Sequence, residues 1–311
     1  MTDSLLCGWR VRSSLPLPEL LPWTGAGDHP PDLAIALGAA SPQTEDPIFS
    51  GPLLKIWRDG SSLFTIPAIA AYHIGADGRT VLVEPLGPID LPSIRAFLFG
   101  TVLAILCQRR GLLPLHASCI RFEGPHGPFA VAFSGSSGAG KSTLAAAFLR
   151  HGHAVLSDDL AVLDMAGERA MVLPSLPRLK LWRHSLDQMN RSPDSLERVR
   201  EALDKYYLPL DRQFCPDALP LAAIFHIARV QDEKHVSREP LKGLQAVLHL
   251  TTNIYHDRTM MRFAGSQRAM LDTAIRFAAR VPRHGRLNFL DGFDQLDALV
   301  AELPSLHEDA Q

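Results

Sequence analysis

The chain has 311 residues, of which 46% are apolar and 21% are charged, and its formal net charge is -2 with histidine neutral. This composition is typical of a globular protein with a sizeable core, and it excludes a disordered chain or a small peptide scaffold. Because the net charge is close to zero, no global positive field would recruit nucleic acid or an anionic membrane. We therefore expect any anionic ligand to be held by a local site, with neither nucleic acid nor a membrane as partner.

Four cysteines stand far apart in the sequence, and none forms a C-x-x-C pair that would bind a metal or close a redox loop. Reduced thiols in the cytoplasm are the simplest interpretation. The N-terminal stretch MTDSLLCGWRVRSS lacks the basic start and long apolar run of a secretory signal. The most apolar segment, FLFGTVLAILC at 97–107, is shorter than the roughly 20 residues that a membrane span requires, so we expect a buried helix in a soluble, cytoplasmic protein.

The first third of the chain alternates turn-forming stretches with short β-type runs. Two of these runs, LFTIPAIAAYHI and TVLVEP, flank GADGR, whose Asp-Gly step is typical of a hairpin. The stretch LPSIRAFLFGTVLAILCQRRG at 91–111 has Pro92 near its start and Gly111 at its end, which are helix start and stop signals. We therefore expect residues 1–110 to form a small β-rich N-terminal domain with a connecting helix.

The remaining residues, 111–311, predict a second domain of the α/β class. LHASCIRF and FAVAF are β-type runs, and the second leads directly into GSSGAGKS at 135–142. A helix-forming segment follows and ends near Gly152, and next comes a β-type run that contains the acidic pair SDD. Strand, glycine-rich loop, helix and strand is the order of a nucleotide-binding α/β unit.

Beyond residue 183 the patterns are weaker. SPDSLERVREALDKYY predicts a polar helix at 192–207, and FHIARV and LNFL predict strands. Further helices are expected around LKGLQAVLHLTTN, SQRAMLDTAIRFAARV and FDQLDALVAEL.

The stretch GSSGAGKS fits the phosphate-loop pattern G-x-x-x-x-G-K-[ST] at every fixed position. In such a loop, small residues let backbone N–H groups point at a phosphate, and the following helix presents its positive dipole end to the same anion. Lys141 would reach the β- and γ-phosphates, and the Ser142 hydroxyl would bind Mg²⁺. We therefore expect ATP and Mg²⁺ as cofactors, the alternative being an ordinary strand-to-helix turn. The expected nucleotide-binding residues are Gly135, Ser136, Ser137, Gly138, Ala139, Gly140, Lys141, Ser142 and Thr143.

Asp158 and Asp159 end the next β-type run, where the chain should emerge beside the loop. Adjacent carboxylates on extended backbone point in different directions, so they can take different roles. One could hold Mg²⁺ while the other accepts a proton from an attacking hydroxyl. The alternative is a solvated acidic turn or a helix cap.

These motifs together resemble the bacterial HPr kinase/phosphorylase family, in which a GxSGxGKS loop and its helix are followed by a GH…ADD segment. Here GSSGAGKS is followed by Gly152 and His153 and then by SDD, and the resemblance covers roughly residues 112–165. It implies a P-loop kinase core of the HPr-kinase C-terminal domain type. By the same resemblance Asp158 is similar to the catalytic acid/base, and Asp159 is similar to a carboxylate on the metal, beside Ser142.

The resemblance extends to a histidine that precedes the loop strand. It also implies, as an expectation, that the protein assembles into a homo-oligomer. His116 in LPLHAS stands in the comparable place and is similar to the family histidine near the active site, the alternative being a structural role. The chain departs from the family where an EIRG-like run is expected, because LPSLPRLKLW occupies that region. This departure puts reverse phosphorylase activity, and the protein HPr as acceptor, in doubt.

The segment PRLKLW instead resembles divergent HPr-kinase-like proteins encoded with peptide-tailoring systems, some of which phosphorylate lasso-peptide precursors. Arg178 and Lys180 in this segment could neutralise charge on the transferred phosphate, and alternation on a strand would put both on one face. A solvated strand edge is the alternative. Tyr206, Tyr207 and the HGR segment at 284–286 could contact nucleotide or acceptor, or serve the core or the surface.

The leading hypothesis is an ATP-dependent kinase that transfers the γ-phosphoryl group to a hydroxyl, with serine expected, of a protein or peptide acceptor. The expected catalytic residues are Asp158, Lys141, His116 and Arg178, and the expected metal ligands are Ser142 and Asp159. A hydrolytic P-loop ATPase used as a switch, a non-catalytic nucleotide-binding module and a small-molecule kinase are the competing hypotheses.

Overall fold

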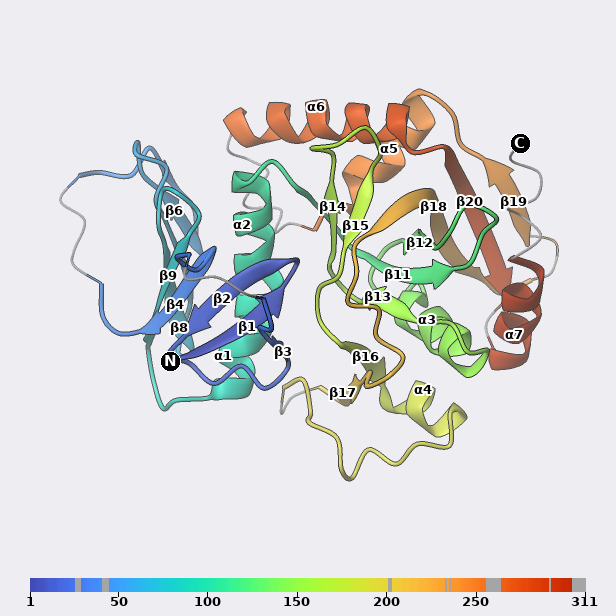
Figure 1. Ribbon diagram of the computed structural model, residues 1–311, viewed down its shortest axis with the longest axis horizontal. Coiled ribbons are helices and arrows are strands. Elements are labelled where there is room, and N and C mark those ends of the chain that lie inside the picture. Colours follow the sequence, from blue (N-terminus) through green and yellow to red (C-terminus); the bar gives the residue numbers. More distant parts are fainter. Residues whose placement is uncertain are drawn as a thin grey trace. The chain divides into compact units, whose positions relative to one another are not determined.

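A computed structural model describes residues 1–25, 29–40, 45–200, 203–232, 234, 236–255, 264–290 and 292–303. It is a mixed α/β protein that divides into two compact units (Figure 1). The first unit holds Met1–Pro114 with Tyr255–Met270, and the second holds Leu115–Ile254 with Leu271–Gln311.

The first unit contains a nine-stranded sheet with the strand order β3-β1-β2-β4-β9-β8-β7-β6-β5. Its strands are β1 (Thr2–Leu6), β2 (Trp9–Ser13), β3 (Leu21–Pro22), β4 (Leu33–Leu37), β5 (Phe49–Ser50), β6 (Leu54–Ile56), β7 (Ser62–Ile66), β8 (Ala70–Ile74) and β9 (Thr80–Pro85). The pair β8–β9 is antiparallel, with Ala70 opposite Pro85, and Gly78 between the strands has a φ of 64°. The Asp-Gly step therefore forms the turn that its sequence predicts.

A long helical stretch packs on this sheet, made of α1 (Leu91–Phe97), a π-helical turn η1 (Leu98–Val102) and α2 (Leu103–Arg109). The Asp90 side chain accepts a hydrogen bond of 3.2 Å from the backbone N–H of Ser93 and so caps its start. The hydroxyl of Tyr72 on β8 donates to the backbone oxygen of Ile94 at 2.9 Å. Among the described helices, Leu91–Arg109 is the one long and apolar enough to span a membrane, and 67% of its apolar window is buried. The prediction of a buried helix at 97–107 is confirmed.

The second unit holds most of the remaining strands and helices, whereas Leu113–Pro114 of β10 and Ala264–Met270 of α6 belong to the first unit. After β10 (Leu113–Leu115), its strands are β11 (Ala117–Phe122), β12 (Phe129–Ser134), β13 (Val155–Ser157), β14 (Ala161–Asp164), β15 (Met171–Leu173), β16 (Arg178–Trp182), β17 (Lys205–Pro209), β18 (Leu219–Val230), β19 (Ser237–Pro240) and β20 (Arg283–Leu290). The helices are α3 (Lys141–Arg150), α4 (Arg183–Gln188), α5 (Leu244–Asn253), α6 (Ala264–Arg280) and α7 (Phe293–Glu302).

Strand direction in this unit brings several chain segments to one edge of the sheet. β12, β18 and β20 are parallel neighbours, whereas β11 pairs antiparallel with both β12 and β13. β13 therefore runs in the same direction as β12, and the carboxyl ends of β12, β13 and β18 lie at the same edge. β16 and β17 form a separate antiparallel pair. The order strand, glycine-rich loop, helix and strand is present as β12, 135–140, α3 and β13.

Helices cover both faces of this sheet. On one face α3 and α7 pack on it, and the ring centroid of Phe148 on α3 lies 5.3 Å from that of Phe133 on β12. Fully burying a phenylalanine stabilises the fold by about 1.5–3 kcal/mol. On the other face, the ring of His249 on α5 lies 4.8 Å from that of His226 on β18. Since His226 alternates with Phe225 and Ile227, which face α3 and α7, α5 covers the opposite face.

The expected polar helix at 192–207 is not formed. Instead, Lys205–Pro209 is strand β17, and Ser192 and Asp194 exchange hydrogen bonds of 2.8 Å and 3.2 Å in a local turn. Such side-chain to backbone bonds compete with a helix, and the pairing of β17 with β16 outweighs the helical propensity of the segment. Residues 201–202 of this segment lie outside the described residues.

Candidate functional site

The glycine-rich loop begins where β12 ends at Ser134, and α3 begins directly after it at Lys141. A Cβ added at Gly135 would lie 2.6 Å from the backbone oxygen of Ile227 on β18, so a side chain has no room there. Gly140 has a φ of 98°, which L-residues rarely adopt. Glycine is therefore required at both fixed glycine positions of the motif, once for close packing and once for backbone conformation.

Lys141 folds back over this loop. Its Nζ donates to the backbone oxygens of Gly135 at 2.8 Å and Ser136 at 3.0 Å, and the residue is only 6% exposed. Burial lowers the pKa of Lys141 to about 8, although Asp159 and Asp158 act in the opposite direction. The ammonium is thus poised at the N-terminal end of α3, where the helix dipole also favours an anion.

Asp158 follows β13 and is 5% exposed. Its Oδ1 accepts hydrogen bonds from the hydroxyls of Ser118 at 2.5 Å and Ser142 at 3.0 Å. Its Oδ2 accepts a hydrogen bond of 2.8 Å from the backbone N–H of Lys180. Three donors from three different elements therefore hold this carboxylate against the first turn of α3.

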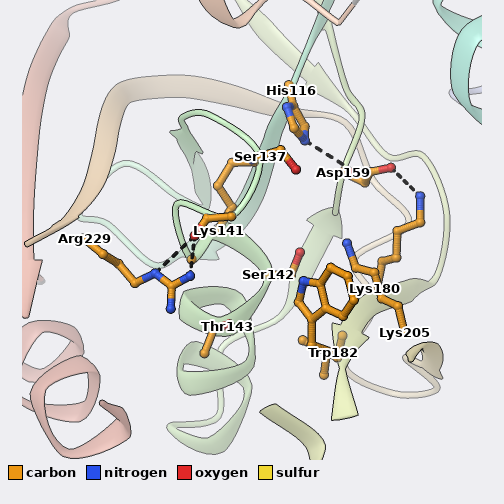
Figure 2. Close-up of a pocket in the computed structure, with 13 residues that line it drawn as sticks. His116, Ser137, Lys141, Ser142, Thr143, Asp159, Lys180, Trp182, Lys205 and Arg229 are labelled. Carbon is orange, nitrogen blue, oxygen red and sulfur yellow. Dashed lines mark hydrogen bonds and ion pairs between the residues drawn. The ribbon is translucent and has the colours of Figure 1, made fainter. Parts of the chain in front are cut away.

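Asp159 points elsewhere, because its backbone takes a positive φ of 68°. Its Oδ2 accepts a hydrogen bond of 2.8 Å from Nζ of Lys180, and its Oδ1 lies 3.4 Å from Nε2 of His116 (Figure 2). Burial alone would raise the pKa of Asp159, but the charge of Lys180 and the contact with His116 outweigh burial and hold it well below its usual range. Asp159 is therefore a carboxylate at neutral pH.

The antiparallel pair of β16 and β17 lies beside these residues and forms one wall of the pocket that they line. Leu179 and Leu181 point into the core, so the alternate side chains of β16 face outward. Trp182 is 48% exposed and pairs across the hairpin with Lys205, whose Nζ lies 5.4 Å from the indole centroid. Burial lowers the pKa of Lys205, and Asp159 partly offsets this.

Arg229, near the end of β18, contacts the loop from the opposite side (Figure 2). Its Nε donates to the backbone oxygen of Gly138 at 3.1 Å, and its Nη2 donates to the same oxygen. The guanidinium thereby ties the glycine-rich loop to the neighbouring parallel strand.

The pocket brings together most of the residues that the sequence predicts. Its lining residues are His116, Ser137, Gly138, Gly140, Lys141, Ser142, Thr143, Asp159, Lys180, Leu181, Trp182, Lys205 and Arg229. Of the predicted loop residues, Gly135, Ser136 and Ala139 do not line it, and Ala139 packs in the core instead.

Other candidates from the sequence lie away from the pocket lining. The Arg178 guanidinium stacks over the ring of Tyr207 at 3.5 Å, so Lys180 and not Arg178 reaches the pocket. The hydroxyl of Tyr206 bonds to Asp204 at 2.9 Å. In the HGR segment, Arg286 donates to Nε2 of His249 at 2.9 Å, on the α5 face of the sheet.

Five residues of the site were not predicted from the sequence: Ser118, Leu181, Trp182, Lys205 and Arg229. Ser118 lies inside an apolar run, and the others lie far from the loop in sequence. Strand pairing alone brings them close, and a single sequence carries no signal for the pairing of β18 with β12.

The electrostatics of the pocket suit an anion. Lys141, Lys180, Lys205 and Arg229 line it, against the single carboxylate of Asp159. Within the described ranges there is no group of three or more His, Cys, Asp or Glu side chains that could hold a metal by themselves. The hydroxyl of Ser142 beside the carboxylate of Asp158 is nevertheless an oxygen pair suited to Mg²⁺, which takes its other ligands from water and phosphate.

No protein-family model matches the chain, and no curated protein matches it. Among solved structures, it is similar to the Hpr(Ser) kinase/phosphatase from Coxiella burnetii, at 11% sequence identity. The alignment covers 63% of this chain and 95% of that chain, with a TM-score of 0.32. This is a weak structural neighbour, so the function is inferred from the geometry of the pocket.

Proposed function

We propose that the chain is an ATP-dependent kinase that transfers the γ-phosphoryl group to a hydroxyl, serine being the expected one, of a protein or peptide. The observation that carries the proposal is the meeting, in one cationic pocket, of the glycine-rich loop with Lys141 and the carboxylate of Asp159. Phosphoryl transfer depends mainly on positioning and charge neutralisation, and each of these requirements has a residue here.

The nucleotide would bind with its terminal phosphates at the loop. The backbone N–H groups of 135–142 and the ammonium of Lys141 are the phosphate-binding groups. Ser142 and Asp158 would hold Mg²⁺, which when bound neutralises charge on the phosphate oxygens. The 3.0 Å hydrogen bond between these two side chains supports this pairing, since both oxygens already face the same point.

We therefore exchange the roles that the sequence suggests for the two aspartates. Asp158 is buried and bonded to Ser142, which suits a metal ligand, whereas Asp159 lines the pocket. Asp159 would accept the proton of the acceptor hydroxyl. The hydroxyl oxygen would form a bond to the γ-phosphorus while the bond from that phosphorus to the bridging oxygen breaks, and this oxygen leaves with ADP. His116 and Lys180 would orient Asp159 through their contacts with its two oxygens.

The cations around the pocket fit the same reaction. Lys180, Lys205 and Arg229 lie on three strands around the loop, where they would neutralise charge on the transferred group. We assign this role to Lys180 and not to Arg178, because the guanidinium of Arg178 is stacked on Tyr207.

All four cysteines are buried free thiols, which supports a reducing compartment such as the cytoplasm.

Incubation with γ-labelled ATP, Mg²⁺ and the small proteins or peptides encoded beside this gene tests the proposal. Mass spectrometry should place the phosphate on an acceptor hydroxyl in a reaction that requires Asp159. Release of label only as inorganic phosphate, at the same rate with and without acceptor, would favour a hydrolytic switch. ATP binding without any turnover would favour a nucleotide-binding module.

A further inference from the structure

A second cleft of about 720 Å³ lies in the same unit, at the opposite edge of the sheet from the glycine-rich loop. Residues near the amino ends of three parallel strands line it: Phe129 of β12, Leu221 of β18 and Arg283 of β20. Because these strands are parallel, their amino ends form one edge, and the loop follows the carboxyl end of β12. The cleft shares no lining residue with the candidate active site.

The floor of the cleft is apolar and held in place by packing. Phe225 lines it and is almost fully buried, and its ring stacks against Phe133 with centroids 6.0 Å apart. Phe129 lines it from the neighbouring strand and stacks on Phe122 at 5.8 Å. Four prolines also line the cleft and restrict the backbone around it, at positions 125, 128, 220 and 282. The apolar floor is therefore preformed.

The rim of the cleft carries three arginines, Arg169, Arg280 and Arg283, against one acidic residue, Glu168. Nη1 of Arg280 donates to the backbone oxygens of Met165 at 3.3 Å and Gly167 at 3.2 Å, so it is bonded to neutral groups. The side chains of Arg169 and Arg283 make no hydrogen bond or ion pair with any other residue that the structure describes. Their charges are therefore not neutralised by a carboxylate of this part of the chain.

We propose that this cleft binds a small organic anion with an apolar, preferably aromatic, body. The guanidinium group matches a carboxylate with two parallel hydrogen bonds, and charge-assisted bonds of this kind are about twice as strong as neutral ones. The apolar floor of Phe129, Leu221 and Phe225 would take the body of the ligand. The volume lies within the ~300–1,000 Å³ that small-molecule sites occupy.

The experiment is a calorimetric titration of the full chain at low salt with 2-naphthoate, which combines an aromatic body with a carboxylate. 2-Naphthamide has the same body without the charge, and acetate has the charge without the body. We expect 2-naphthoate to bind with 1:1 stoichiometry and at least about tenfold more tightly than either comparison compound, since each lacks one half of the recognition. Equal affinities for 2-naphthoate and 2-naphthamide, or no binding, would overturn the proposal.

Single substitutions test whether 2-naphthoate binds in this cleft. Arg283→Ala and Arg169→Ala should each weaken 2-naphthoate binding several-fold, and Arg283→Lys, which retains the charge, controls for a folding defect and should weaken it less. Arg212→Ala removes an exposed arginine outside the cleft and should leave the affinity unchanged. Lys141→Ala should also leave it unchanged, because the loop is at the other edge. Binding that Lys141→Ala abolishes and Arg283→Ala leaves intact would place the anion in the nucleotide pocket and reject the second site.

Discussion

The hydroxyl of Ser142 donates a hydrogen bond of 3.0 Å to Oδ1 of Asp158, although sixteen residues separate the two along the chain. The first turn of α3 positions the hydroxyl, and the end of β13 positions the carboxylate. Because Ser118 of β11 donates to the same oxygen at 2.5 Å, the carboxylate is held on both sides. This contact distinguishes the two neighbouring aspartates, since Asp159 bonds instead to the side-chain ammonium of Lys180.

Asp159→Asn should lower kcat by about 10²–10⁴-fold and change MgATP affinity little, because it removes the proton acceptor but no phosphate contact. Steady-state kinetics with the acceptor and a titration with a non-hydrolysable ATP analogue measure the two effects separately. Asp158→Asn is the matched variant, and it should raise the Mg²⁺ concentration needed for half-maximal activity. If Asp158→Asn lost turnover at saturating Mg²⁺ while Asp159→Asn kept it, the roles would be those first inferred from the sequence.

The affinity for ATP should fall as the pH rises above about 8. The pKa of Lys141 is about 8 before binding, and a bound phosphate raises it because the anion favours the ammonium form. Binding at pH 8 should therefore take up close to half a proton at this residue. Calorimetry in buffers of different ionisation enthalpy measures this uptake. Lys141→Arg remains charged throughout and should abolish the dependence, and an unchanged proton uptake in that variant would contradict the prediction.

Gly135→Ala should weaken ATP binding by at least about tenfold, since its Cβ would meet the backbone oxygen of Ile227 at 2.6 Å and displace the loop. Gly152→Ala is the matched control. Gly152 has a φ of 87° but nothing within 4 Å of an added Cβ, so this change should cost about 1 kcal/mol of unfolding free energy and leave ATP affinity unchanged. Urea unfolding and nucleotide titration of both variants check this. Equal ATP affinities for the two variants would show that close packing at Gly135 does not shape the loop.

The unfolding free energy should fall as the pH drops from about 6.5 toward 4. His226 is 4% exposed, and burial, followed by the charges of His249, His284 and Arg286, lowers its pKa from 6.5 to about 3. The unfolded chain therefore binds a proton in this window that the folded chain does not. The stabilisation is complete above the unfolded pKa and is lost as the pH falls toward the folded one, with a slope of up to about 1.4 kcal/mol per pH unit.

His226→Asn should flatten this slope. Nδ1 of His226 lies 2.6 Å from the hydroxyl of Ser134, the last residue of β12, and asparagine offers a polar replacement that does not titrate. Urea unfolding at several pH values, compared between the wild type and the variant, measures the difference. The same slope in both proteins would assign the acid sensitivity to other groups, such as His284, whose pKa burial lowers to about 4.

Local features of this protein could be read from the sequence, because local interactions create them. The glycines of 135–142 predict the loop, and the helix and strand that follow are present as α3 and β13. The helix at 91–109 has its cap, its apolar length and its terminal glycine within one stretch of chain. The polar segment at 192–207 misled prediction, because pairing of β17 with β16 outweighed its helical propensity.

The arrangement of the site depended on contacts between distant segments. The parallel pairing of β12 with β18 brings Arg229 to the loop, and the register of β16 with β17 sets Lys205 beside Trp182. A positive φ at Asp159, which its residue type does not require, turns its carboxylate toward His116 and Lys180. The sequence by itself determined the phosphate-type loop and the pair of acidic residues. Only the tertiary structure decided which aspartate faces Ser142 and which cations reach the pocket, because strand pairing and register are set by packing across the whole unit.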